Sequence, residues 1–196
     1  GNDILFDDSL CEQGRNFCNK IWNCFRLIKG WEVADNEMPA TNQWGVEWFK
    51  AVLAKTQEEV ADLFSKYRLS EALMAIYKLY CDEFSGWYLE IIKPAYGQPI
   101  DRATYEQTIQ FMDTMLKLLH PFMPFITEEL WQAIEERQEG ESLMVSPLNA
   151  EQTLDKAAQL LENATQCFDI ISAIRNIRAQ KNISPKEVLT LVAPSE

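Results

Sequence analysis

The chain has 196 residues, of which 47% are hydrophobic and 11% aromatic, so it can bury a sizeable core and is not extensively disordered. Its formal net charge of −12 argues against a general binder of nucleic acids or membranes, because such proteins usually attract polyanions through overall positive charge. Any contact with a polyanion must therefore be local. Only 7 glycines and 8 prolines interrupt the chain, and its apolar residues recur at helical spacing, which predicts long helices.

Residues 9–31 are predicted to form a helix with two chemically different faces. Ser9 followed by Glu12 indicates a capping box at its start, and Gly30 is a plausible stop. The apolar face has a spacing of three and four residues and consists of Leu10, Gly14, Phe17, Ile21, Cys24 and Ile28. The opposite face carries Arg15, Asn19, Asn23 and Arg26, with Trp22 beside them.

The same helix is basic in an acidic protein. Between residues 13 and 31 the chain carries Arg15, Lys20, Arg26 and Lys29, and it has no aspartate or glutamate. A solvated helix face normally mixes charges of both signs. Two interpretations follow, namely contact with another protein domain and contact with a phosphate backbone, and the face alone slightly favours the first.

Five further helices are predicted from the apolar periodicity and from capping and breaking residues. They span approximately residues 42–66, 70–93, 101–119, 124–138 and 154–181. Asn42 and Asp101 are the expected N-caps of two of them, and Pro94 ends a third because proline cannot continue a helix. Segments 143–145 and 188–192 are short and apolar enough to form single strands.

These elements predict an all-α fold, an antiparallel bundle of about six helices joined by short connections. We expect one domain over residues 1–192, with a short strand at its C-terminal end and a truncated tail at 193–196.

The residues that most catalytic or metal sites require are missing. The single histidine, His120, precedes a proline and is expected to be a corner residue rather than a metal ligand or a catalytic base. The five cysteines form no CxxC pair and are predicted to be reduced core residues. The sequence has no phosphate-binding glycine loop and no apolar run long enough for a membrane span. We therefore expect neither catalysis, nor a cofactor, nor a metal in this chain.

Two aromatic residues stand just past predicted helix ends, each beside a lysine. Trp31 follows Lys29, and Tyr96 follows Lys93 and a proline. Such positions suit a platform on which nucleic-acid bases stack, although simple packing explains each residue equally well. A second basic run holds Arg175, Arg178, Lys181 and Lys186, and a helix C-terminus, where cations complement the helix dipole, is sufficient to explain it.

Three segments, in this order and at this spacing, resemble the anticodon-binding helical domain of class I aminoacyl-tRNA synthetases. They are GRNFCNKIWNCFRL, EFSGWYLEIIKP and LLHPFMPFITEELW. The tail DIISAIRNIRAQKNISPKE is similar to the basic helix that closes the bundle in this family. The resemblance covers residues 2–192. Within the class these sequence segments are most similar to the valyl enzymes, with the isoleucyl enzymes as the alternative.

The resemblance implies an anticodon reader that has no activity of its own. Its implied partners are tRNA for valine, at the anticodon loop and inner stem, and the catalytic domain of a longer cytoplasmic protein. In this family the catalytic domain charges tRNA using ATP and Mg²⁺ and carries HIGH and KMSKS signatures, neither of which occurs in this sequence. We accordingly expect the chain to have been cut from something longer.

The expected tRNA-binding residues combine the basic face with the two aromatics. They are Arg15, Asn19, Lys20, Arg26, Lys29, Trp31, Lys93 and Tyr96. The aromatic rings would stack on splayed anticodon bases, and the cations would neutralise phosphates. The remaining alternative is a helical bundle that uses the same basic face only to dock a protein partner.

Overall fold

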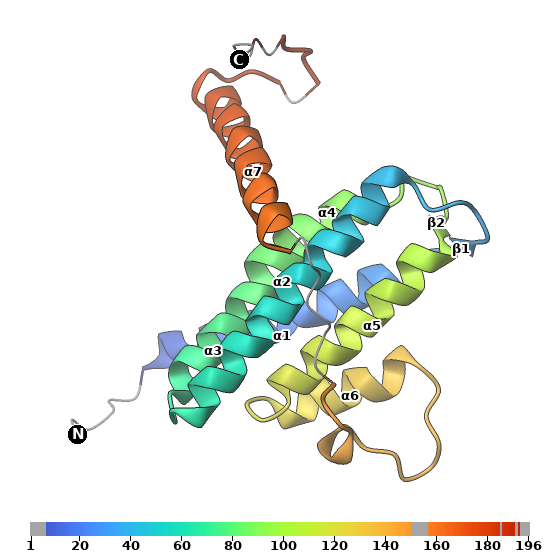
Figure 1. Cartoon of the computed structure of the whole chain (residues 1–196), viewed down its shortest axis with the longest axis vertical. Coiled ribbons are helices and arrows are strands. Elements are labelled where there is room, and N and C mark those ends of the chain that lie inside the picture. The colour runs from blue at the N-terminus through green and yellow to red at the C-terminus, as the bar shows by residue number, and fades with distance from the viewer. Residues whose placement is uncertain (1–6, 150–156, 185, 191, 193–196) are drawn as a thin grey trace. The chain divides into compact units, whose positions relative to one another are not determined.

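The computed structural model describes residues 7–149, 157–184, 186–190 and 192, which form helices with very little sheet (Figure 1). The chain divides into two compact units, residues 1–155 and 156–196. The predicted all-α fold is confirmed.

The first unit contains all but one of the described elements. In chain order they are α1 (Asp8–Lys29), β1 (Val33–Ala34), α2 (Ala40–Ser65), α3 (Leu69–Lys78), the π-helical segment η1 (Leu79–Tyr88), α4 (Leu89–Ile92), β2 (Ile100–Asp101), α5 (Arg102–Leu119), α6 (Pro124–Ile134) and the 3-10 turn η2 (Leu143–Val145). The second unit contains α7 (Ala157–Gln180).

Aromatic rings fill the core of the first unit. Phe49 of α2 is fully buried, and its ring centroid lies 4.8 Å from Tyr88, 5.3 Å from Phe84 and 5.0 Å from Phe111 of α5. Burying such large rings stabilises the fold by about 1.5–3 kcal/mol each. This cluster joins α2, η1 and α5, so these elements hold the remaining helices in place.

In helix α1 the predicted apolar face is buried only along the last four turns. Phe17, Ile21, Cys24 and Ile28 are buried, whereas Leu10 of the first turn is exposed. The predicted capping box is wrong. The N-cap is Asp7, whose extended backbone lets its carboxylate accept a hydrogen bond from the Ser9 amide at 2.8 Å, and Ser9 lies inside the helix.

The helix expected over residues 70–93 is a continuous rod built of α3, η1 and α4. Its end is as predicted: Lys93 has a ψ of 132°, which the following proline requires. The ten-residue π-helical segment was not predicted. There the Leu89 amide bonds to the Phe84 carbonyl, five residues back, and Tyr80, Phe84 and Tyr88 are buried at four-residue spacing.

A buried polar cluster replaces the N-cap expected at Asn42. Helix α2 begins at Ala40, so Asn42 lies within its first turn. The Asn42 amide donates hydrogen bonds to the Asp101 carboxylate at 3.2 Å and to the Thr104 hydroxyl at 3.3 Å. Asp101 is the N-cap of α5, as predicted, and accepts from the Thr104 amide at 2.8 Å. The starts of α2 and α5 are therefore fastened to each other.

Other segments also differ from the expectation. Residues 143–145 form the turn η2 instead of a strand. Glu128 supports this turn by accepting hydrogen bonds from the Leu143 amide at 3.0 Å and the Ser142 hydroxyl at 2.9 Å. Helix α6 ends at Ile134, four residues early. His120 is the expected corner residue, and its Nδ1 lies 2.7 Å from the Thr127 hydroxyl oxygen.

Helix α7 agrees with the helix predicted over 154–181, although residues 154–156 fall outside the described part. The strand expected over 188–192 does not form in its described residues, 188–190 and 192. Beyond the helix, the Arg178 guanidinium donates to the carbonyls of Ser184 at 2.6 Å and Glu187 at 2.8 Å. Arg178 thus supports the chain after a helix C-terminus.

We predict that Asp101→Ala destabilises the chain by about 2–4 kcal/mol, because it removes an N-cap and one of the two acceptors of the buried Asn42 amide. Asp101→Asn, which can still cap α5, should lose less. Urea unfolding measures both variants, with Asp82→Ala on an exposed position of η1 as the control. A loss no larger than that of the control would contradict this account of the cluster.

Candidate nucleic-acid interface

A short parallel strand pair joins the two loops that carry Trp31 and Tyr96. Val33 of β1 pairs with Ile100 of β2, and the Ile100 amide donates to the Glu32 carbonyl at 2.8 Å. The segment after α1 and the connector after α4 therefore meet at one end of the first unit, where α2 and α5 begin (Figure 1). The sequence separates these loops by about sixty residues and gives no strand signal for either.

Tyr96 is displayed at the tip of a tight turn. The Gln98 amide bonds to the Ala95 carbonyl at 2.9 Å, and Gly97 has a φ of +74°, which the third position of a type II turn requires. The side chain of Tyr96 is fully exposed and makes no ring contact within the described residues. Because the turn is fixed by glycine and flanked by prolines, the ring is presented with little backbone freedom.

Trp31 lies in a more sheltered position. Its backbone amide bonds to the Ile28 carbonyl at 3.2 Å, which continues the last turn of α1, and its side chain is half-buried. Like Tyr96, it has no ring contact in the part of the chain that is described. The two aromatics that the sequence singled out are thus at the same end, one exposed and one partly covered.

A pocket of about 340 Å³ lies between the loop after β1 and the connector after α4. Its polar lining includes Asn36, Thr41, Lys93 and Gln98, and its apolar lining includes Ile91 and three prolines. Sequence reasoning missed Asn36 and Gln98. The sequence does show one side-chain amide in each of two proline-containing loops. That these two loops lie side by side depends on the strand pair, which the sequence does not reveal.

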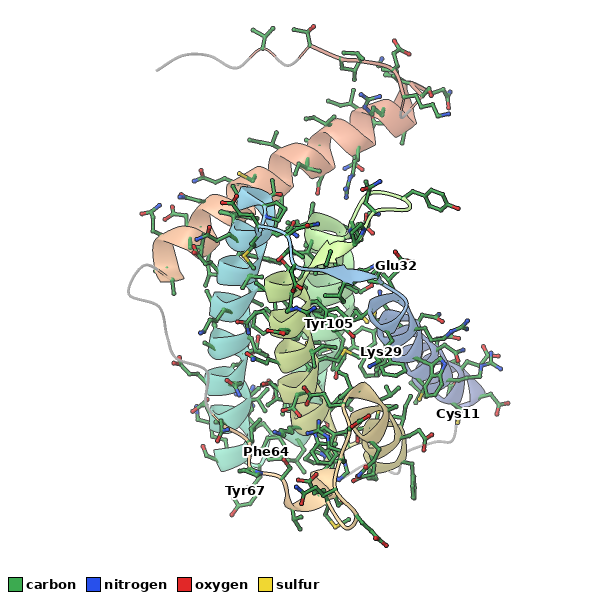
Figure 2. The ribbon with its side chains drawn as sticks, turned by 90° about the vertical axis from the view of Figure 1, so that its right-hand side faces the viewer. Cys11, Lys29, Glu32, Phe64, Tyr67 and Tyr105 are labelled. Carbon is green, nitrogen blue, oxygen red and sulfur yellow. The ribbon has the colours of Figure 1, made fainter. Side chains whose placement is uncertain are left out.

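All three expected lysines already have partners in the protein. The Lys20 ammonium donates to the Cys81 carbonyl at 3.3 Å, and Lys29 (labelled in Figure 2) donates to the Ile134 carbonyl at the end of α6, at 3.1 Å. Lys93 pairs with Glu90 at 2.6 Å, with both side chains about half exposed. Lys20 and Lys29 therefore contribute to packing, and a phosphate contact would compete with these bonds.

The remaining expected residues of α1 face solvent. Arg15, Asn19 and Arg26 are exposed, and Arg15 has only a long contact of 3.9 Å with Glu12. Arg26 forms no ion pair within the described residues. This exposed strip is the freest positive charge on the helix.

The paired loops are themselves acidic. Glu32, Asp35 and Glu37 follow α1, and all three are exposed. The Arg102 guanidinium donates a hydrogen bond to Asp35 and holds the pKa of that carboxyl below its ordinary value. Charge alone would therefore not hold a polyanion at these loops. The attractive interactions available there are stacking on the aromatic rings and hydrogen bonds to the side-chain amides.

The described residues hold neither a metal cluster nor a helix that could span a membrane. Among the described residues, no group of three or more histidine, cysteine, aspartate or glutamate side chains is placed to hold a metal ion. None of the described helices is both long enough and apolar enough to cross a bilayer. All five cysteines are free thiols, and burial raises the pKa of Cys24 and of Cys81.

Comparison with known proteins gives a consistent family. The model of the family "Anticodon-binding domain of tRNA ligase" matches residues 46–193. The chain is 65% identical over 191 residues to a valine–tRNA ligase of Phocaeicola vulgatus and 62% identical over 194 residues to one of Bacteroides thetaiotaomicron. Each alignment covers 97% of this chain and 22% of the relative.

A more distant valine–tRNA ligase, from Fusobacterium nucleatum, is 34% identical over 205 residues, covering 98% of this chain and 23% of the relative. The chain thus spans about a fifth of the length of the relatives that it matches. The family match covers most of the chain, including parts of both units. The chain therefore belongs to the family of anticodon-binding domains of tRNA ligases.

Proposed function

We propose that this chain is the anticodon-binding part of a valine–tRNA ligase and that it binds the anticodon arm of valine tRNA. The family and the names of the relatives support the proposal. The structural observation that carries it is the pairing of β1 with β2, which brings the loops of Trp31 and Tyr96 together at one end of the bundle, where a pocket between the two loops has Asn36 and Gln98 in its lining.

The chemistry of this end suits unpaired bases. Single-stranded RNA is usually read by stacking its splayed bases on aromatic rings and by hydrogen bonds to their edges. Tyr96 offers a ring whose faces are open, and Trp31 offers a partly covered one. Asn36 and Gln98 can each donate and accept, so they can bond to base edges in the pocket.

Phosphates are held elsewhere in this proposal. Arg15 and Arg26 are exposed on α1, with Asn19 between them, and we assign the phosphate backbone of the stem to the two arginines. Lys93, half exposed beside Glu90, assists at the Tyr96 turn. Lys20 and Lys29 remain candidates, although each would have to leave a carbonyl partner.

The longer protein would supply the chemistry. We propose that it attaches valine to its tRNA in the cytoplasm, using ATP and Mg²⁺ in a catalytic domain outside these 196 residues. That catalytic domain is then this chain's second partner. No residue described here is assigned a catalytic step, a metal or a cofactor.

Tyr96→Ala should weaken binding of valine tRNA by about one to two orders of magnitude, since stacking contributes roughly 1–3 kcal/mol per base. Tyr96→Phe keeps the ring and should bind nearly as well as the unchanged chain. Fluorescence anisotropy with labelled tRNA measures the dissociation constants.

The matched control for this experiment is Tyr67→Ala. Tyr67 is also highly exposed, at 90%, but follows the C-terminus of α2, at the opposite end of that helix from the paired loops (Figure 2). If both alanine variants weakened binding equally, the Tyr96 turn would not be a stacking platform.

Arg26→Ala should lower the affinity for all tRNAs similarly and reduce the slope of log affinity against log salt by about one phosphate contact. Lys29→Ala should instead lower the thermal midpoint, because the carbonyl at the end of α6 loses its donor. Salt titrations and thermal unfolding of both variants separate the two roles. A salt slope that Arg26→Ala leaves unchanged would remove Arg26 from the phosphate contacts.

A further inference from the structure

A second pocket, of about 350 Å³, lies along α1, apart from the paired loops. Helix α1 forms one wall, and residues of η1 and α4 form the other. The lining residues are Asn16, Asn19, Lys20, Asn23, Cys24, Leu27, Ser85, Leu89 and Glu90. Three asparagines and a serine make this lining unusually rich in neutral polar groups.

Asn16, Asn19 and Asn23 form what we call the amide row. They stand at positions i, i+3 and i+7 and therefore share one face of α1, over about 10 Å of helix. All three are exposed, and none has a hydrogen-bond partner within the described residues. Each amide can donate and accept at the same time.

The pocket is poorly suited to phosphate. Glu90 places a carboxylate on its lining and is already paired with Lys93 at 2.6 Å. The one cation of the lining, Lys20, donates to the Cys81 carbonyl at 3.3 Å. What remains for a ligand is a set of neutral groups that donate and accept, together with the apolar side chains of Leu27 and Leu89.

A hydroxyl group both donates and accepts, and ribose 2′-hydroxyls line the wide, shallow minor groove of an RNA helix. The amide row lies between eight and fifteen residues before Trp31 in the sequence. At the rise of an α-helix, this places it about 12–22 Å from Trp31 along the helix axis. If the anticodon loop is bound at Trp31 and the RNA stem runs back along α1, the stem would pass over the amide row. Arg15 and Arg26, on the neighbouring strip, would face the phosphates on either side.

We propose that the amide row binds 2′-hydroxyl groups in the minor groove of the anticodon stem and so recognises RNA by its sugars, independently of sequence and with little dependence on salt. This inference rests on the proposed function and adds a contact that neither the aromatic turn nor the arginines provide.

The test is a double-mutant cycle between protein amides and RNA hydroxyls. The proteins are the unchanged chain and the double variant Asn19→Ala/Asn23→Ala, with Gln110→Ala on exposed α5 as the control. The RNAs are valine tRNA and the same tRNA with 2′-fluoro nucleotides throughout its anticodon stem, which remove the hydroxyls. Thermal unfolding verifies that each variant folds.

The double variant should bind the all-RNA tRNA about tenfold more weakly, since each neutral hydrogen bond contributes a modest amount. The fluorinated tRNA should show a similar loss with the unchanged chain, and the two changes together should lose little more than either alone. The salt slope should stay the same in all four combinations.

Losses that simply multiply would overturn the assignment of the amide row. If binding still depended on the anticodon in that case, the proposed function would stand and only this inference would fall. A chain that bound neither tRNA, or bound every anticodon equally, would instead count against the proposed function itself.

Discussion

The buried carboxylate of Asp101 is the group on which the arrangement of the candidate site depends. It caps α5 through the Thr104 amide and accepts from Asn42 of α2, and it also belongs to β2. One side chain thus fixes the starts of two helices and the end of the connector that carries Tyr96. An unpaired buried carboxylate is costly, so the cluster favours a single arrangement of this end.

In our proposal, helix α1 is the surface that this acidic chain offers to a polyanion. One side of the helix packs through Phe17, Ile21 and Ile28. The exposed arginines lie on the opposite side, and the amide row lies between the two. Since the proposed phosphate contacts involve only a few cations while the net charge of the chain is −12, binding in our proposal depends on fit and on hydrogen bonds more than on long-range charge.

Much of the fold followed from the sequence. Apolar spacing predicted the helices, and Asp101 and Pro94 marked boundaries correctly, because capping and the missing proline amide are local effects. The π-helical segment η1, the strand pair and the Asn42 cluster were not predicted. The strand pair and the Asn42 cluster depend on partners distant in the chain, and a two-residue strand has no periodicity to detect.

The candidate site was predictable in part for the same reason. Trp31 and Tyr96 stood out individually, since an aromatic beside a lysine at a helix end is a local pattern. That their loops are paired, and that Asn36 and Gln98 line a common pocket, required the fold. For the lysines, the sequence suggested more freedom than the structure shows. Lys20 and Lys29 looked free in sequence, but each donates to a carbonyl of another element.

The most direct measurement compares binding of this chain to valine tRNA and to the same tRNA with a changed anticodon, at two salt concentrations. Our account predicts that the changed anticodon weakens binding at both concentrations, because bases are read at the paired loops. Equal and strongly salt-dependent binding to both tRNAs would mean that the chain holds phosphates only, and it would contradict base recognition by Trp31 and Tyr96.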